Sequence, residues 1–140
     1  LYGAVGSDAN SIAPFKTPLS SMSPTLVFDE TGRPIMSVGA PGGTRIISCT
    51  ALTIFNHLFF KQSLESSVKN IRIHHQWQPD TLYIEQPGPA PRELEKLKAM
   101  GYKIELGGIP CRVMSAALDT NNSELTAVAD PRDIGTAAAK

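Results

Sequence analysis

Hydrophobic positions along the chain change their spacing several times, and each spacing predicts a type of element. Residues 25–30 (TLVFDE) and 34–40 (PIMSVGA) are mostly apolar runs joined by a short turn with Gly32, which predicts two hairpin-paired strands. From Thr44 onward the apolar residues recur at three- and four-residue intervals, which predicts a helix that packs one stripe on a core. The residues of this stripe are Ile47, Ala51, Ile54, Phe55, Leu58 and Phe59.

Shorter elements are predicted in the second half of the chain. The helix with the most complete end signals is expected over residues 90–101, where Pro91 stands in the first turn, acidic residues come early, lysines come late and Gly101 takes the C-cap position. Ser63 is expected to cap another helix. The remaining predictions are that helix over 63–70, strands over 81–86 (TLYIEQ) and 102–106 (YKIEL), and a hairpin of 112–119 and 124–130 around a turn at 120–123.

This order of elements predicts a fold of the α/β (α+β) class. Two strands, two helices, a strand, a helix and three further strands, mostly in hairpins, favour antiparallel pairing. Residues 1–24 contain three Pro, two Gly and five Ser and show no sustained period, so they are expected to form a loop-rich approach. A chain of 140 residues can bury one core, so residues 1–140 are expected to form a single segment.

The charge balance argues against two classes of partner. Lys plus Arg and Asp plus Glu each number 13, so neither nucleic acid nor an anionic membrane surface is favoured, because both attract a basic excess. The longest apolar stretch, 46–60, is too short and too often interrupted by polar residues to span a bilayer. Near the end of the chain, Asp130, Arg132 and Asp133 are expected to form a structural ion pair or a turn.

Cysteine and histidine positions give no pattern typical of a metal site. Cys49 lies in the apolar helical pattern and Cys111 follows a proline, so two buried free thiols are expected rather than a disulfide. The spacing of these cysteines does not match thiolate zinc ligands. His74 and His75 are adjacent, and on a strand they point to opposite faces, which makes them poor partners for one metal ion.

Gly42 and Gly43 stand between a strand that ends near Ala40 and a helix that starts near Thr44. The first amides of a helix have no intrahelical acceptor and carry partial positive charge, and glycine lets a ligand approach them closely. Such a corner suits an anion, or an oxygen that becomes anionic during a reaction. The alternative is that the glycines only turn a strand into a helix. A phosphate-binding P-loop is disfavoured because no Lys-Ser/Thr pair follows the glycines.

A second candidate stretch is PLSSMSPT, residues 18–25, which holds three serines between two prolines. Hydroxyls on a stiff segment can donate to a carboxylate without the cost of desolvating a charged group. The same hydroxyls can instead be local turn formers. A nucleophilic Ser20 or Ser21 would need a base, for which His74 or His75 is a candidate, but the chain contains no G-x-S-x-G elbow.

Several longer phrases point in one direction when taken together. They are NSIAPFKTPLSSMSPTLVFDETGRPIMSVGAPGGTRI, RIHHQWQPDTLYIE, LKAMGYKIEL and VADPRDIG, in this order. They resemble the C-terminal part of the small subunit of γ-glutamyltranspeptidase, and the resemblance runs from Tyr2 to about Gly135. PLSSMSPT combined with PGGTRI is highly specific, and HHQWQPD resembles bacterial members more than animal ones.

This resemblance implies an N-terminal nucleophile hydrolase with a four-layer αββα sandwich, built by a large and a small subunit that arise by autoprocessing. It implies an acyl-enzyme on the N-terminal threonine of the small subunit, formed from γ-glutamyl compounds such as glutathione and resolved by water or by an amino acid or peptide acceptor. The implied partners are the large subunit and the remaining N-terminal part of the small subunit. The implied location is periplasmic or secreted, and neither a metal nor an organic cofactor is implied.

The resemblance also gives roles to individual residues. Ser20 and Ser21 correspond to the serine pair that binds the α-carboxylate of the donor, Met22 lines the same pocket, and Gly42 and Gly43 match the pair whose amides form the oxyanion hole. The catalytic threonine phrase and the N-N-E-x-x-D-type phrase that holds the α-amino group of the donor are not in this chain. By itself the chain is therefore expected not to turn over substrate and to expose apolar sheet faces that a partner covers.

Three alternatives to this function remain open from the sequence. Within the same fold, relatives act as cephalosporin acylases or poly-γ-glutamate depolymerases. A different class is a non-enzymatic module that binds an anion at Gly42 and Gly43. The third is the serine hydrolase with a histidine base.

Overall fold

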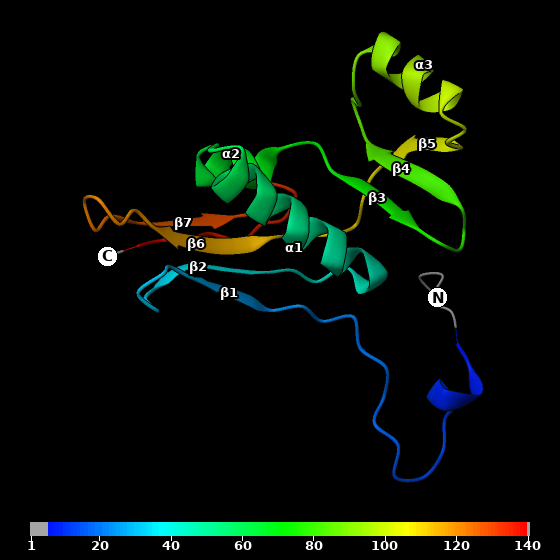
Figure 1. Cartoon of the computed structure of the whole chain (residues 1–140), viewed down its shortest axis with the longest axis horizontal. Coiled ribbons are helices and arrows are strands. Elements are labelled where there is room, and N and C mark those ends of the chain that lie inside the picture. The colour runs from blue at the N-terminus through cyan, green and yellow to red at the C-terminus, as the bar shows by residue number, and fades with distance from the viewer. Residues whose placement is uncertain (1–5, 140) are drawn as a thin grey trace.

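The chain forms two β-sheets joined by helices (Figure 1). A computed structural model describes residues 6–139. The larger sheet has the strand order β1-β2-β6-β7, and the smaller sheet has the order β3-β4-β5. The helices and turns are η1 (Asp8–Asn10), η2 (Gly43–Arg45), α1 (Ile46–Ile54), the π-helical η3 (Phe55–Phe59), α2 (Leu64–Lys69) and α3 (Pro91–Ala99), and the strands are β1 (Thr25–Phe28), β2 (Pro34–Gly39), β3 (Ile73–Gln76), β4 (Thr81–Glu85), β5 (Ile104–Gly107), β6 (Met114–Leu118) and β7 (Leu125–Ala129).

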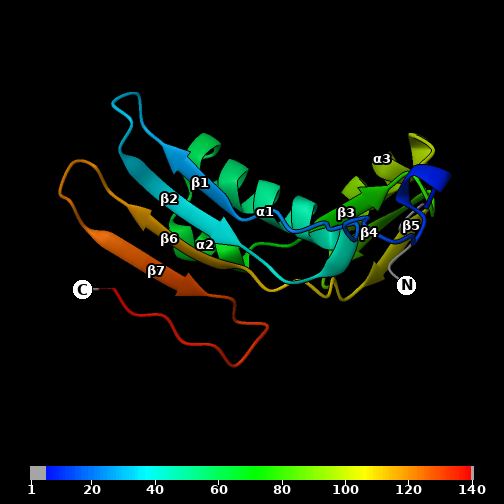
Figure 2. The same cartoon turned by 90° about the horizontal axis from the view of Figure 1, so that it is seen from below.

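The four-stranded sheet is antiparallel throughout and confirms both predicted hairpins. β1 pairs with β2 across a turn in which Gly32 takes a φ of 82°. β6 pairs with β7 in an unbroken register, and the pairing of β2 with β6 joins the two hairpins into one sheet. Helices α1 and α2 lie over one face of this sheet (Figures 1 and 2).

The core lies between these helices and the sheet. Side chains alternate along each strand, so Met36 and Val38 of β2 and Ala117 of β6 face the helices and are buried. Residues 108–113, which join β5 to β6, enter the same core, and we call them the strap. The buried cluster comprises Met36, Val38, Cys49, Leu64, Val68, Ile109, Cys111, Val113 and Ala117.

The other face of the four-stranded sheet is apolar and exposed, as expected from the sequence. Leu26 and Phe28 of β1 are 60% and 53% exposed, and Met114 and Leu125 of the other hairpin are 42% and 44% exposed. A shallow hollow of about 200 Å³ on this face is lined by residues of all four strands. Within residues 6–139, no helix or strand covers the face (Figure 2). Such a surface is typical of a sheet that another layer covers.

The helix that follows the glycines begins where predicted but buries a different face. Ile47, Phe55 and Phe59 of the predicted stripe are more than half exposed, whereas Ile46 and Cys49 are buried. The expectation that the whole stripe faces the core is therefore wrong. The reason is that this helix carries apolar side chains on two faces, and their spacing does not tell which face the sheet covers.

Cys49 and Cys111 form a disulfide, which corrects the expectation of two free thiols. Cys49 lies on the buried face of α1 and Cys111 lies in the strap, and both side chains belong to the core cluster. Their Cα atoms are 6.6 Å apart, a separation that a disulfide can span. The two residues are 62 positions apart in sequence, so tertiary packing brings them together and no local pattern predicts the pair.

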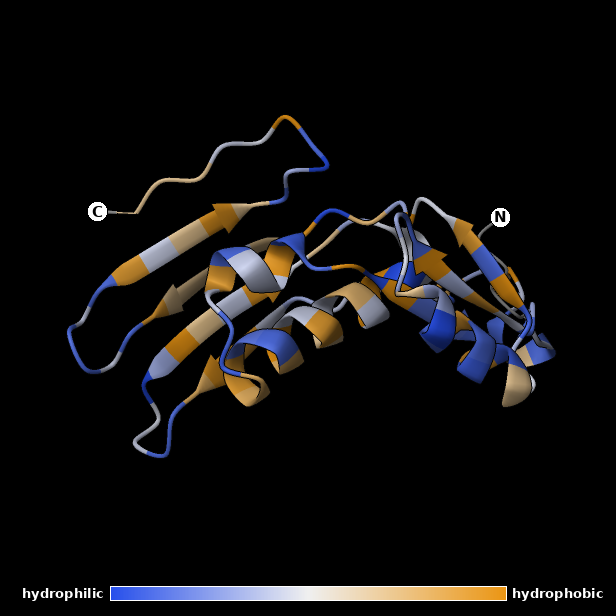
Figure 3. Ribbon diagram, turned by 90° about the horizontal axis from the view of Figure 1, so that it is seen from above, coloured by the Kyte–Doolittle hydropathy of each residue, from blue (hydrophilic) through white to orange (hydrophobic). Residues whose placement is uncertain are grey.

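The three-stranded sheet departs in one respect from the antiparallel expectation. β3 and β4 form an antiparallel hairpin, whereas β4 and β5 pair in parallel. A parallel pair needs a crossover connection, and α3 supplies it. As predicted, α3 has Pro91 in its first turn and Gly101, with a φ of 93°, after its end, and it is hydrophilic over most of its length (Figure 3). The described part of the chain contains no helix with the length and apolarity that a bilayer crossing requires.

Candidate functional site

The predicted glycine corner lies where β2 passes into α1. β2 ends at Gly39, and after two residues Gly42 precedes η2, which leads directly into the helix. Gly42 has a φ of 153° and a ψ of 14°, and Gly43 has a φ of 60°. Glycine adopts such positive φ values readily, and residues with a Cβ rarely do. The backbone path of the corner therefore depends on this glycine pair.

Gly42 packs directly against the strap. A Cβ atom on Gly42 would lie 2.9 Å from the carbonyl oxygen of Pro110 and 3.1 Å from the Cβ of Cys111. The N–H of Arg112 donates to the carbonyl of Pro41 at 3.3 Å, and the disulfide joins the strap to α1. The corner is thus fixed on the side of the strap, and Gly42 is required by packing as well as by its φ.

The polarity of the corner suits a group that gains negative charge. The carbonyl of Gly42 accepts from the N–H of Arg45 at 3.2 Å. Within residues 6–139, the backbone hydrogen bonds between the corner and its surroundings are accepted by carbonyls of the corner. The N–H groups of Gly42 and Gly43 take no part in these bonds. The first turns of η2 and α1 contain no acidic residue in this described segment. N–H groups at the positive end of a helix are suited to a carboxylate or an oxyanion.

Ser20, Ser21 and Met22 lie in the extended segment that leads into β1. The N–H of Met22 donates to the Ser20 hydroxyl at 3.1 Å, and the Ser23 hydroxyl donates to the carbonyl of Ser21 at 3.1 Å. These local bonds are typical of serines in turns. Among the residues that the structure describes, neither the Ser20 nor the Ser21 hydroxyl donates a proton to another group. The two hydroxyls therefore keep a donor for an external acceptor.

Antiparallel pairing places the serine segment and the glycine corner at the same end of the sheet. Thr25, the first residue of β1, pairs with Val38 near the end of β2. The segment before β1 therefore runs beside the segment after β2, and the Cα of Pro24 lies 4.0 Å from where a Cβ on Gly39 would stand. No hydrogen bond in the described part of the chain joins the serine pair to the corner. The fold brings the two stretches to the same end of the sheet but leaves their polar groups separate.

The two adjacent histidines point to opposite faces of β3, as predicted. His74 is buried, with Nδ1 bonded to the Ser48 hydroxyl at 2.8 Å and Nε2 bonded to Oε1 of Gln76 at 2.8 Å. His75 lies on the exposed face, and its Nε2 is 2.9 Å from the Asp80 carboxylate. Both rings are engaged away from the serine pair, so these contacts do not support a serine nucleophile with a histidine base. Residues 6–139 also contain no group of three or more His, Cys, Asp or Glu side chains placed to hold a metal ion.

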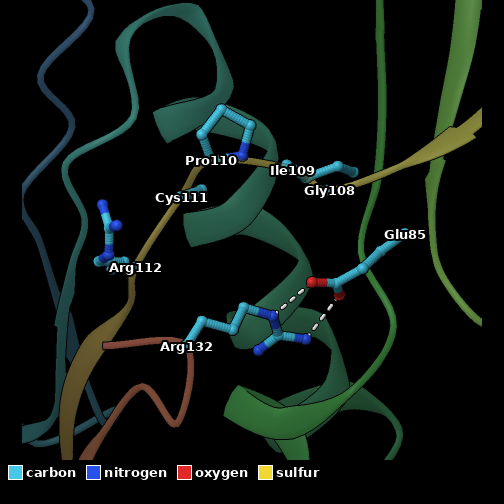
Figure 4. A pocket seen from close by; sticks show the side chains of 7 residues that line it. All are labelled: Glu85, Gly108, Ile109, Pro110, Cys111, Arg112 and Arg132. Carbon is cyan, nitrogen blue, oxygen red and sulfur yellow. Dashed lines mark hydrogen bonds and ion pairs between the residues drawn. The ribbon is translucent and has the colours of Figure 1, made fainter. Parts of the chain in front are cut away.

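A buried ion network lies behind the strap. The Asp130 carboxylate is paired with the guanidinium groups of Arg72 and, at 3.1 Å, Arg132, and it accepts from the N–H of Val113 at 2.6 Å. Arg132 also forms two hydrogen bonds with Glu85, at 2.5 and 2.6 Å (Figure 4). The sequence predicted an ion pair at Asp130 and Arg132, which is confirmed, but it did not predict Arg72 and Glu85 as partners.

The network holds the strap in place through hydrogen bonds as well as charge. Burial alone would raise the pKa of Asp130, but the N–H of Val113 and the side chain of Arg72 hold this pKa below its ordinary value of 3.8. Burial also lowers the pKa of Arg72, and its hydrogen bond and charge interaction with Asp130 oppose that shift. The same guanidinium donates to the carbonyls of Cys111 and, at 3.2 Å, Val68. A cavity of about 390 Å³ lies beside the network, lined by Glu85, Arg132 and five residues of the strap (Figure 4).

Comparison with known proteins gives consistent matches along the chain. A family model described as gamma-glutamyltranspeptidase matches residues 1–140. The chain is 37% identical over 134 residues to a glutathione hydrolase proenzyme of Escherichia coli and 42% identical over 142 residues to one of Pseudomonas aeruginosa, each match covering 96% of this chain. It spans 23% and 24% of the length of these two relatives.

A solved structure extends the similarity to three dimensions. A mutant gamma-glutamyltranspeptidase of Helicobacter pylori superposes with a TM-score of 0.89 at 38% sequence identity, over 95% of this chain and 72% of the solved chain. Similarity at this level covers both sheets and the segments that connect them. The fold expected from the sequence, part of a four-layer αββα sandwich with mostly antiparallel strands, is thereby confirmed.

Proposed function

This chain belongs to the γ-glutamyltranspeptidase family, and from that premise we propose that the protein containing it cleaves γ-glutamyl amides such as glutathione. The γ-glutamyl group is passed to water or to an amino acid or peptide acceptor. The observation that carries the proposal is the glycine corner, in which Gly42 and Gly43 stand at a helix start with positive φ values and Gly42 is packed against the strap. This geometry and the family membership support the same chemistry.

The reaction begins at an N-terminal threonine located outside this chain. Its hydroxyl oxygen attacks the γ-carbonyl carbon while its own α-amino group takes the proton, and the carbonyl oxygen becomes negatively charged. The N–H groups of Gly42 and Gly43 donate to that oxygen. Collapse of the intermediate breaks the amide bond, releases the protonated amine and leaves a γ-glutamyl ester on the threonine. Water or an acceptor amine then attacks the ester carbonyl while the same N–H groups donate to its oxygen. This step releases the γ-glutamyl product and restores the threonine.

Ser20, Ser21 and Met22 hold the other end of the donor in this proposal. The two hydroxyls donate to the α-carboxylate of the γ-glutamyl group, and Met22 covers its carbon chain. The placement of this segment beside the glycine corner at one end of the sheet supports the assignment. Neutral donors suit this role because they bind a carboxylate at a lower desolvation cost than a buried cation.

We further propose that the chain works inside an autoprocessed heterodimer, beside the large subunit and the remaining part of the small subunit. The exposed apolar face of the four-stranded sheet supports this, because a second sheet of a sandwich would cover it. A periplasmic or secreted location is supported by the Cys49–Cys111 disulfide, since structural disulfides persist in oxidising compartments.

The full-length protein is expected to release p-nitroaniline from γ-glutamyl-p-nitroanilide and to leave a cephalosporin side-chain amide intact. The test compares initial rates on both substrates under identical conditions. Turnover of the cephalosporin amide alone would replace the proposal by an acylase of the same fold. Binding of an anion without turnover of either amide would indicate the non-enzymatic module.

The single variants Ser20→Ala and Ser21→Ala are each expected to lower kcat/KM for γ-glutamyl-p-nitroanilide by roughly 10–100-fold, mainly through a higher KM. Each variant removes one neutral donor to a charged carboxylate. Ser11→Ala is the matched control, because the Ser11 hydroxyl in the same extended region already donates to the carbonyl of Asp8 at 2.8 Å. An unchanged KM in both variants would exclude the serine pair from donor binding.

A further inference from the structure

The start of α1 is attached to the smaller sheet by two side chains that the proposed chemistry does not use. Arg45, the last residue of η2, has its guanidinium carbon 5.2 Å from the centre of the Tyr83 ring on β4. Ser48, in the first turn of α1, shares a hydrogen bond of 2.8 Å with Nδ1 of His74 on β3. Arg45 and Ser48 are three positions apart, so their side chains leave the helix on the same side.

The two strand residues form one platform. His74 and Tyr83 pair directly across the β3–β4 ladder, and their ring centres are 6.2 Å apart. The His74 side chain is buried, so neither the helix start nor the sheet can shift there without breaking a contact. The segment immediately after the glycine corner is therefore attached to two paired residues of the smaller sheet, His74 and Tyr83.

The direction of each hydrogen bond at His74 follows from its neighbours. Nε2 of Gln76 donates to the carbonyl of Gln78 at 2.6 Å, which leaves Oε1 of Gln76 to accept from the Nε2–H of His74. Nδ1 of His74 then carries the lone pair and accepts from the Ser48 hydroxyl. Burial lowers the pKa of His74 and keeps the ring neutral, so this tautomer is the one that holds α1.

We propose that Ser48 and His74, together with the Arg45–Tyr83 contact, are positioning residues that set the direction in which the glycine corner presents its N–H groups. This inference rests on the proposed function of that corner. The strap fixes the corner from one side, but a glycine pair has few steric limits on its own rotation, so a second attachment is needed on the helix side. The Ser48–His74 bond and the Arg45–Tyr83 contact supply that attachment within two turns of the glycines.

The effect of losing this attachment is expected on kcat rather than on KM. The hydroxyls proposed to bind the donor lie in another segment, so ground-state binding is unaffected. Oxyanion stabilisation depends on donor direction, and a displacement of about 1 Å remote from the reacting atoms can cost on the order of 100-fold in rate. A residue that only supported the fold would instead lower the amount of active protein and leave kcat per active site unchanged.

The test uses the matured full-length protein with γ-glutamyl-p-nitroanilide, and active sites are counted with a covalent γ-glutamyl analogue. Ser48→Ala and His74→Ala are each expected to lower kcat per titrated site by about 10–100-fold, with KM changed by less than about threefold. The matched control is His75→Ala, which removes the neighbouring imidazole from the exposed face of the same strand. This control is expected to keep kcat within about twofold of the wild type.

Conservative variants separate positioning from general support. Ser48→Thr keeps the hydroxyl, and His74→Asn keeps an acceptor near the position of Nδ1, so both are expected to recover a large part of kcat. Ser48→Ala removes a single hydroxyl from a half-buried site and is informative even if the His74 variants do not mature. A wild-type kcat per site in Ser48→Ala would overturn the inference. A wild-type protein without turnover would instead overturn the proposed function.

Discussion

Replacing Gly42 by alanine is expected to lower kcat of the full-length protein by about 10²–10³-fold, the loss typical of removing one oxyanion donor. The added Cβ would lie 2.9 Å from the carbonyl oxygen of Pro110, and the φ of 153° is strained for alanine. The strap cannot retreat, because the disulfide and Arg72 hold Cys111 in place. The corner must therefore move and turn its N–H groups. Steady-state kinetics per titrated active site measure the effect.

Gly32→Ala is the matched control for this substitution. Gly32 also has a positive φ, of 82°, but a Cβ on it would meet nothing within 4 Å. The control thus introduces backbone strain without a collision, and it is expected to keep kcat within about threefold of the wild type while costing about 1 kcal/mol of stability. If Gly42→Ala and Gly32→Ala turn over equally fast, the glycine corner does not stabilise the oxyanion.

Replacing Asp130 by asparagine is expected to lower the free energy of unfolding by about 3–5 kcal/mol, the cost of breaking a buried ion pair from one side. Asparagine keeps the size of the side chain but removes the charge that faces Arg72 and Arg132. These two guanidinium groups would then share a buried site with only the Glu85 carboxylate for compensation. Thermal and urea unfolding of the full-length protein measure the change.

The control for Asp130→Asn is Asp133→Asn in the same loop. Asp133 pairs with Arg112 at 3.1 Å, and its side chain is 38% exposed. Partly exposed ion pairs contribute little, so the control is expected to cost less than about 1 kcal/mol. Equal destabilisation by both substitutions would show that the buried network contributes no more to stability than the partly exposed ion pair.

The pH dependence of stability provides an independent test of how much the ionised Asp130 carboxylate contributes to stability. Because its pKa is lowered in the folded protein, its contribution is fully present above the ordinary value of 3.8 and is lost as the pH falls through the lower folded value. The wild-type protein is therefore expected to lose stability below about pH 4 more steeply than Asp130→Asn. Parallel unfolding curves for the two proteins between pH 5 and about pH 2 would contradict the assignment.

Local signals in the sequence were sufficient for most of the elements. Ser63, whose hydroxyl accepts from the N–H of Ser66 at 3.1 Å, and Gly101, which follows α3 with a positive φ, stand where the ends of helices were expected. The two hairpins of the large sheet were equally readable, because their turns and alternating faces are encoded within a few residues. The parallel pairing of β4 with β5 was missed, because a crossover is not distinguished from a meander by the strands alone.

Features that depend on contacts distant in sequence were not predictable in the same way. The choice between the two apolar faces of α1, the Cys49–Cys111 pair and the partners of Asp130 all come from tertiary packing. Arg72 carried a weak signal, because it stands one residue before β3 and two before the buried His74, so its side chain points to the same side of the extended chain. A cation at an inward position requires a buried anion, but the sequence does not say which of 13 acidic residues supplies it.

The candidate site likewise combines features that local sequence predicts with features that depend on contacts distant in sequence. Local chemistry marked the glycine pair and the serine pair as candidates, the family resemblance gave them roles, and the β1–β2 hairpin is enough to place them at one end of the sheet. The close contact of Gly42 with Pro110 was not foreseen, because it depends on a segment almost seventy residues away. The sequence explained why glycine tolerates a nearby ligand, and the structure adds that the neighbouring backbone leaves no space for a larger residue.

The strap has a mechanical consequence, because it is one continuous piece of chain between β5 in the smaller sheet and β6 in the larger one. A rocking motion of the smaller sheet against the larger one would displace the strap, whose residues Pro110 and Cys111 lie directly against Gly42. The rigidity of the connection between the two sheets therefore also determines how well the glycine N–H groups stay aligned.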